Sequence, residues 1–256
     1  MSKHQIIFSK SNKIKELQKF ERYEFKYLLR KQLSDAIEEE VRHFMAYDGY
    51  VHPELGNRYF VRSLYFDNWI ASNFYEKVDG LKRRNKYRIR TYSQEEDCDV
   101  PLFLEKKGRV NERTYKLRTS IENEHLNYFL HSGNDVILNK YTDNKLVEGF
   151  VFDCIRKRLK PRVLVDYSRR PYINNYGLYF RLTFDSHVEA LNTDHLYPDT
   201  DTQSFECRAG YTILEVKFER SMPPWFHRII QNYNLRRLSI SKFVIGMAQC
   251  GLAVDI

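Results

Sequence analysis

The sequence lacks the cysteine and histidine spacings that indicate a disulfide framework or a zinc site. Its four cysteines lie far apart and form no Cys-x-x-Cys pair. Its eight histidines include no pair at the spacing that places two metal ligands on one helix face. The pattern therefore indicates neither a disulfide-stapled domain nor structural zinc.

The chain also lacks a long apolar run. No window approaches the roughly 20 consecutive apolar residues that a membrane-spanning helix needs. The first 20 residues are basic and contain no continuous apolar stretch of the kind found in signal peptides. There is no internal repeat, low-complexity tract or interdomain linker. We therefore expect a cytoplasmic protein with a polar N-terminal arm at residues 1–20 and a single domain at residues 21–256.

Basic residues outnumber acidic ones, 42 against 34, which gives a net charge of +8. An anionic partner is therefore plausible, and nucleic acid, a phospholipid surface or a phosphorylated small molecule would each fit. Aromatic residues make up 15% of the chain and could stack on bases. Most of them alternate with charged residues, however, and so belong to the opposite, core-facing side of each strand. This placement argues against a nucleic-acid partner.

Charged residues recur at every second position in several short segments. A strand places residues i and i+2 on one face, so Glu24 and Lys26 project together with Arg22, while Phe25 faces the other way. A single strand with this pattern usually presents its charged face to water. Here the charged set is dominated by arginine and lysine with a few carboxylates, which favours binding of a polyanion and a metal ion. The segments are RYEFKYLL (22–29), KYRIRTY (86–92), FLEKKGR (103–109), ERTYKLR (112–118), YFRLTFD (179–185) and ILEVKFE (213–219).

The remaining patterns predict helices between antiparallel strands. Ser34 is the expected N-cap of a first helix, Asp67 or Asn68 of a second, and Ser239 or Ser241 of a terminal helix through Ala248. Residues 120–160 have helical periodicity that is broken near residues 133 and 134. Residues 162–172 and 179–185 form an expected hairpin, and residues 189–210 an expected long surface loop. The fold class is α+β, with strands that could close into a barrel and helices packed outside.

Nine segments in sequence order carry a resemblance to a known family. They are RYEFKYLL, SLYFD, KYRIRTY, FLEKKGR, RVLVDYSRRPY, RLTFD, ILEVKFE, PPWF and SKF. From about residue 21 to 250 the chain resembles the VTC domain, the polyphosphate polymerase branch of the triphosphate tunnel metalloenzyme (CYTH-like) superfamily. The resemblance implies a closed antiparallel eight-stranded β-barrel. Its basic interior would bind a triphosphate, a growing polyphosphate chain and a divalent ion, manganese or magnesium.

The first strand departs from the hydrolytic and cyclase relatives. Those proteins open with Glu-x-Glu-x-Lys, whereas the corresponding positions here are Arg22, Glu24 and Lys26. Arginine at the first position adds positive charge where those relatives carry a metal-facing carboxylate. The departure favours the polymerase branch over a triphosphatase or a class IV adenylate cyclase.

The resemblance and the charge pattern together assign roles to individual residues. The expected catalytic residues are Lys26, Arg88, Arg90, Arg181 and Lys242. The expected substrate-binding residues are Lys86, Lys107, Lys116, Arg118, Arg169 and Lys217. Glu215 is the first choice of metal ligand, whereas Glu24 and Glu105 could reach the ion or pair with neighbouring lysines. Asp185 is expected to partner an arginine, and the hydroxyls of Tyr65 and Tyr167 are assigned to the core rather than to phosphate.

The leading hypothesis is an enzyme that transfers the γ-phosphate of ATP to inorganic polyphosphate and releases ADP. A tunnel hydrolase acting on tripolyphosphate or a nucleoside triphosphate is one alternative, and a non-catalytic polyphosphate-binding module is another. The expected partners are ATP and polyphosphate, without nucleic acid. Fungal members of the family work beside membrane proteins, so a membrane partner is compatible with the resemblance.

Overall fold

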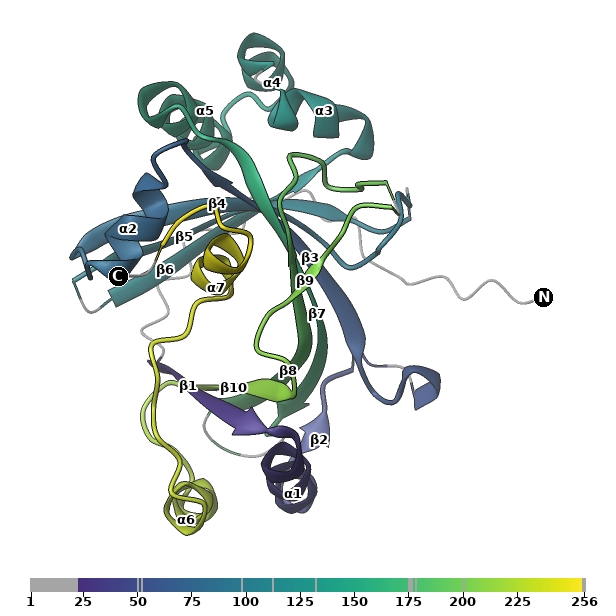
Figure 1. Cartoon of the computed structure of the whole chain (residues 1–256), viewed down its shortest axis with the longest axis vertical. Helices are drawn as coiled ribbons and strands as arrows, with labels where there is room; N and C mark the ends of the chain where they lie inside the picture. The colour runs from purple at the N-terminus through teal and green to yellow at the C-terminus, as the bar shows by residue number, and fades with distance from the viewer. Residues whose placement is uncertain are drawn as a thin grey trace.

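The computed structural model describes residues 23–49, 51, 53–97, 99–111, 113–131, 133–174, 177, 179–199 and 201–254. The predicted N-terminal arm and Arg22 lie outside these residues. The described chain forms one curved sheet in which every strand pairing is antiparallel (Figure 1). Its strands are β1 (Tyr23–Arg30), β2 (Ala46–Tyr47), β3 (Tyr59–Asp67), β4 (Arg83–Thr91), β5 (Leu102–Val110), β6 (Arg113–Ile121), β7 (Lys160–Ile173), β8 (Phe180–Leu191), β9 (Phe205–Glu206) and β10 (Tyr211–Phe218).

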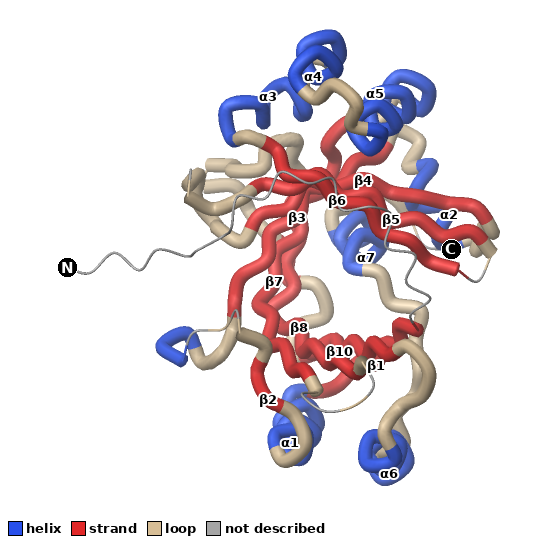
Figure 2. The backbone as a smooth tube through the Cα atoms, turned by 180° about the vertical axis from the view of Figure 1, so that it is seen from behind, coloured by secondary structure: helices blue, strands red, loops and turns tan. Residues whose placement is uncertain are grey.

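The predicted closed eight-stranded barrel is wrong in one respect, because the sheet is open. Its main order is β1-β10-β8-β7-β3-β4-β5-β6, with the two short strands β2 and β9 attached beside β7 and β8. In the described residues β1 and β6 do not pair. Figure 2 shows the resulting C shape, with β4, β5 and β6 on one arm, β1 and β10 on the other, and β3 and β7 between them.

The segment between the last two helices explains why the ladder does not close. It runs along the open side of the sheet (Figure 2). The backbone N–H of Leu238 donates to the carbonyl oxygen of Lys26 at 2.8 Å, on β1. A backbone group of β1 that a closing strand would have used is therefore satisfied by this segment.

Helices cover both the outer and the inner side of the sheet. They are α1 (Lys31–Arg42), α2 (Ser72–Val78), α3 (Leu126–Leu130), α4 (Asn134–Lys140), α5 (Lys145–Lys157), α6 (Pro224–Asn232) and α7 (Lys242–Gln249), with short 3-10 turns at Pro53–Leu55 and Asn123–His125. Helices α3, α4 and α5 share an apolar cluster with β4 and β5, and α1 and α6 share another with β1, β8 and β10. The outer face is therefore packed with apolar side chains, whereas the inner face carries the charged side chains beside a separate apolar cluster under α7. None of the helices in the described ranges is long and apolar enough to cross a membrane.

Helix α7 lies on the inner face, against β7 and β8. A Cβ atom on Gly246 would come within 3.0 Å of Val165 Cγ2 and 3.2 Å of Ala190 Cβ. The missing side chain therefore lets the helix approach the sheet closely. Phe243 and Met247 are fully buried in the apolar cluster that also contains Val165 and Ala190. This packing fixes the first turn of α7, where Lys242 stands, inside the curve of the sheet.

The ends of the helices and strands agree with the local sequence signals at some positions and not at others. Ser34 does not cap α1, because that helix begins at Lys31 directly after β1, with Arg30 at the N-cap position. At α2 the N-cap position is Ala71, but the side chains of Asp67 and Asn68 accept the backbone N–H groups of residues 72, 73 and 74, as a cap would. The predicted loop at 189–210 is shorter, because β8 continues to Leu191 and β9 pairs with it. The expected hairpin is confirmed by the pairing of β7 with β8, although residues 175 and 176 of its turn lie outside the described residues.

Candidate anion-binding site

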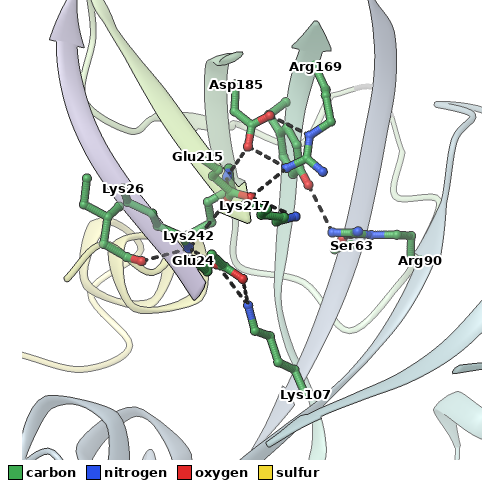
Figure 3. Close-up of polar contacts among 12 residues, drawn as sticks. Glu24, Lys26, Ser63, Arg90, Lys107, Arg169, Asp185, Glu215, Lys217 and Lys242 are labelled. Atoms are coloured by element: carbon green, nitrogen blue, oxygen red, sulfur yellow. Dashed lines mark hydrogen bonds and ion pairs between the residues drawn. The ribbon is translucent and has the colours of Figure 1, made fainter. Parts of the chain in front are cut away.

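Charged side chains from seven strands (β1, β4, β5, β6, β7, β8 and β10) and from α7 gather on the inner face. The register places Lys26 of β1 beside Glu215 of β10, and Arg88 of β4 beside Glu105 of β5. Alternation along each strand then directs these side chains inward and their aromatic neighbours outward. Figure 3 shows that the lysines and arginines converge on a few carboxylates. The charges form two clusters on facing parts of the curved sheet.

The first cluster surrounds Glu215 and Asp185, which are both buried. Lys242 donates to Asp185 and, at 3.0 Å, to Glu215. Arg169 donates two hydrogen bonds of 2.6 Å to the two oxygens of Asp185, as expected of an arginine partner. Burial alone would raise the pKa of Glu215, but Lys242 and Lys26 hold that pKa well below its ordinary value. Glu215 is therefore ionised and acts as a counterion for the cations around it.

Glu24 and Lys107 extend the first cluster toward the open edge. Lys107 Nζ lies 2.9 Å from Glu24 Oε2, and Lys26 Nζ lies 3.2 Å from Glu24 Oε1. Lys26 also contacts Glu215 Oε1 at 3.4 Å, so it bridges the two carboxylates. Lys217, on the same face, lies 3.5 Å from Glu215. Burial lowers the pKa of Lys217 to about 8, although Glu215 and Glu24 act in the opposite direction.

The second cluster surrounds Glu105, whose exposed fraction is 1%. Two nitrogen atoms of Arg88 donate to its Oε2 atom, at 2.6 and 2.8 Å. Its Oε1 atom lies 2.7 Å from Lys116 Nζ and 2.6 Å from Arg118 Nε. Arg90 approaches to 3.9 Å. Burial would raise the pKa of Glu105, but Arg88 and Arg90 hold that pKa well below its ordinary value. The ionised Glu105 is therefore the shared counterion of four cationic side chains.

Two tyrosine hydroxyls that the sequence assigned to the core contact arginines of the second cluster. Arg88 donates to the hydroxyl oxygen of Tyr65 at 2.7 Å, and Arg90 donates to that of Tyr167 at 3.1 Å. Each hydroxyl keeps its own proton for donation to another group. Both rings are buried, so the tyrosines pack in the core and also orient guanidinium groups. The sequence reasoning assigned both hydroxyls to core packing and missed their contacts with arginine.

Arg181 and Lys86 differ from the other predicted site residues. Arg181 faces inward opposite Lys217, but its guanidinium group is held at 2.8 Å by Asp48, which follows β2. Lys86 donates to the hydroxyl of Ser241 at 2.9 Å. The pKa of Lys86 lies well below its ordinary value, mainly because of burial and also because Lys107 and other cations repel its charge. Lys86 is thus a site where an added anion would relieve unfavourable electrostatics.

The carboxylates do not fit a resident divalent ion. Among the described residues, no three histidine, cysteine, aspartate or glutamate side chains are placed to hold a metal. Each oxygen of the predicted ligands Glu215, Glu24 and Glu105 already lies within 3.5 Å of a lysine or arginine nitrogen. Glu105 also belongs to a different cluster from the other two. A hard cation requires oxygen ligands that face it together, and this arrangement turns them toward ammonium and guanidinium groups instead.

Comparison with known proteins finds a matching family model and solved structures of low sequence identity. The family model of the VTC domain matches residues 21–250. No curated protein sequence matches the chain. A candidate adenylate cyclase of Bacillus halodurans is 14% identical, with a TM-score of 0.48, and the match covers 85% of this chain and 92% of that one. A candidate adenylyl cyclase of Hippeastrum, described as having a dominant triphosphatase activity, is 13% identical with a TM-score of 0.48, over 89% and 97% of the two chains. The PH1819 protein of Pyrococcus horikoshii is 13% identical with a TM-score of 0.41, over 84% and 92%.

Proposed function

This chain belongs to the VTC domain family, and we propose that it is a polyphosphate polymerase. It would transfer the γ-phosphate of ATP to the end of an inorganic polyphosphate chain and release ADP. The observation that carries the proposal is the pair of facing cation clusters around Glu105 and Glu215. Together they place more positive than negative charge on an enclosed face, which suits a substrate with several phosphates.

The reaction needs positioning and charge compensation more than covalent help. A terminal oxygen of the polyphosphate chain attacks the γ-phosphorus of ATP, and the bond between that phosphorus and the bridging oxygen of ADP breaks. Arg88, Arg90 and Arg169 are held in place by carboxylate or hydroxyl partners. Fixed guanidinium groups suit the transferred phosphate, because its charge is spread over three oxygens that must be held in line.

Lysines suit the part of the substrate that moves. An ammonium group contacts phosphate less directionally than a guanidinium group, so a chain can slide past it. Lys26, Lys107 and Lys217 lie together around Glu24 and Glu215. In the absence of substrate the carboxylates offset the repulsion among these cations. We infer that the growing chain follows these lysines, while Arg88 and Arg90 of the second cluster and Arg169 of the first hold the reacting triphosphate.

Incubation of the purified protein with ATP and manganese tests the proposal. Long polyphosphate is separated from orthophosphate by gel electrophoresis, and ADP is measured in parallel. Chain growth with stoichiometric ADP is expected, with loss of both in Arg90→Ala and no change in Arg228→Gln, a surface arginine on α6. Orthophosphate and ADP without chain growth would instead identify a hydrolase. Tight polyphosphate binding without turnover would identify a binding module.

A further inference from the structure

One buried hydroxyl group on the inner face has no role in the site described above. Thr183 on β8 is 1% exposed, and among the described residues its hydroxyl oxygen has no hydrogen-bond partner. Its neighbours along the strand, Leu182 and Phe184, belong to the apolar cluster on the outer face, so Thr183 faces inward. A buried polar group without a partner lowers the stability of a fold, and most such groups are paired. This hydroxyl is therefore a candidate for a hydrogen bond that forms only when a ligand is bound.

The sheet register places Thr183 directly opposite Glu215 on β10. Side chains opposite each other in an antiparallel pair have Cβ atoms about 4.5–5.5 Å apart, so a hydroxyl and a carboxylate can meet there. On its other side Thr183 is opposite Pro171 of β7, whose side chain has no polar atom. The carboxylate of Asp185, two residues along β8, already accepts two hydrogen bonds of 2.6 Å from Arg169. Glu215 is therefore the acceptor within reach of this hydroxyl.

The cations around Glu215 hold its two oxygens loosely compared with those of Asp185. Lys242 donates to Glu215 at 3.0 Å, whereas Lys26 and Lys217 lie at 3.4 and 3.5 Å. A bound phosphate group attracts these same ammonium groups. When they turn toward phosphate, the buried Glu215 keeps its charge but loses part of its compensation, which is unfavourable. A hydrogen bond from a neutral donor to the carboxylate would offset part of that loss.

We propose that Thr183 is a positioning residue that donates a hydrogen bond to Glu215 once bound phosphate has drawn Lys26 and Lys217 away from this carboxylate. In the ligand-free protein the lysines occupy the carboxylate and the hydroxyl has no partner. In the bound protein the hydroxyl replaces them, and the two ammonium groups hold phosphate. Thr183 thus favours transfer of the lysines from carboxylate to substrate without touching the substrate. The inference rests on the proposed function only in requiring a ligand with several phosphates.

Thr183→Val and Thr183→Ser test the hydroxyl, because the first removes it at similar volume and the second keeps it. Calorimetric titration with tripolyphosphate should show about fivefold weaker binding to Thr183→Val, the effect of one hydrogen bond, and nearly wild-type binding to Thr183→Ser. The ligand-free Thr183→Val protein should melt at the wild-type temperature or above it, since it loses an unpaired buried hydroxyl. A lower melting temperature with unchanged affinity would show a purely structural role and overturn the proposal.

Thr212→Val is the matched control for these measurements. Thr212 is also buried, on β10, but it shares the outer face of that strand with Leu214 and Val216. Loss of its hydroxyl should leave the affinity for tripolyphosphate unchanged. An equal loss of affinity in Thr212→Val and Thr183→Val would mean that any buried hydroxyl in this sheet has the same effect, which overturns the assigned role.

A double-mutant cycle with Glu215→Gln separates action through Glu215 from direct contact with phosphate. Glutamine has no charge to compensate, so Thr183→Val should change the affinity by less than about twofold in that background. A fivefold loss in both backgrounds would show that the hydroxyl binds phosphate itself, and would overturn the proposal.

Lys217→Gln provides a second background that does not alter the carboxylate. Without this lysine the hydroxyl can donate to Glu215 before any ligand binds, so adding Thr183→Val should now lower the melting temperature of the ligand-free protein. An unchanged or higher melting temperature would contradict the proposal. Because only binding and melting are measured, failure of the polymerase assay would leave these results interpretable.

Discussion

Lys107 on β5 reaches across the open edge of the sheet to Glu24 on β1, with 2.9 Å between Nζ and Oε2. The two strands are not paired there, so this ion pair and the segment before α7 hold the two arms of the sheet together. The side chains remain partly exposed, at 36% for Lys107 and 22% for Glu24. The contact is therefore open to competition from an entering anion.

Glu24→Gln should strengthen binding of tripolyphosphate by about two- to fivefold. The substitution removes a negative charge and releases Lys107 and Lys26 from their carboxylate, and a partly exposed charge contact is worth roughly 0.2–1 kcal/mol. The free energy of unfolding should fall by less than about 1 kcal/mol for the same reason. Calorimetric titration and a denaturant melt measure the two effects. Weaker binding would mean that Glu24 supports the ligand indirectly, through a cation that it positions.

Arg88→Ala should lower turnover by at least about 100-fold, because it removes a guanidinium group that compensates charge on the transferred phosphate. It should also lower the free energy of unfolding by about 2 kcal/mol, since the buried Glu105 loses two donors. Adding Glu105→Gln should recover most of the stability but not the turnover. Recovery of turnover in the double variant would show that Arg88 acts only by supporting Glu105.

The residues on the inner face of the sheet could be predicted from the sequence, but the pairing at the edges of the sheet could not. Alternation along KYRIRTY placed Arg88 and Arg90 on one face because a strand has a period of two, and that rule is local. Whether β1 pairs with β6 depends on groups far apart in the chain, such as the N–H of Leu238 and the carbonyl of Lys26. No local pattern contains that information. The closed barrel was therefore an inference from the family resemblance, and the structure differs at that point.

The partners of the carboxylates were hidden for a similar reason. Glu105 and Lys107 share one face of β5, which left open whether Glu105 binds a metal or pairs with a cation. Its surroundings come from β4 and β6 as well, and the register brings three arginines and a lysine to it. Ser34 failed as a helix cap because β1 runs directly into α1 without the turn that a cap residue usually provides.

The ligand-free protein should bind manganese only weakly. The oxygens of the carboxylates in both clusters are engaged by lysine or arginine, and a metal would have to displace these cations. Manganese should be retained when tripolyphosphate is present, because phosphate oxygens are themselves suitable ligands. Electron paramagnetic resonance of manganese, with and without tripolyphosphate, distinguishes the two states. Tight binding to the ligand-free protein, abolished in Glu215→Gln, would instead establish Glu215 as a ligand.

Affinity and stability should respond to pH in opposite directions above neutrality. Burial lowers the pKa of Lys217 to about 8 in the folded protein, below the value of about 10.4 for an unfolded chain. Raising the pH from 7 to 9 should therefore remove a cation and weaken tripolyphosphate binding. Between about 8 and 10.4 the unfolded state holds more protons at this residue than the folded state, so the contribution of Lys217 to stability increases with pH.

Lys217→Arg provides the matched control, because a guanidinium group stays protonated throughout this range. The variant should lose less tripolyphosphate affinity than the wild type between pH 7 and 9, and its melting temperature should gain less. Binding titrations and thermal melts at pH 7, 8 and 9 measure both differences. If the wild type and the variant follow the same pH profile, Lys217 does not titrate in this window, and its ammonium group is not what weakens phosphate binding at high pH.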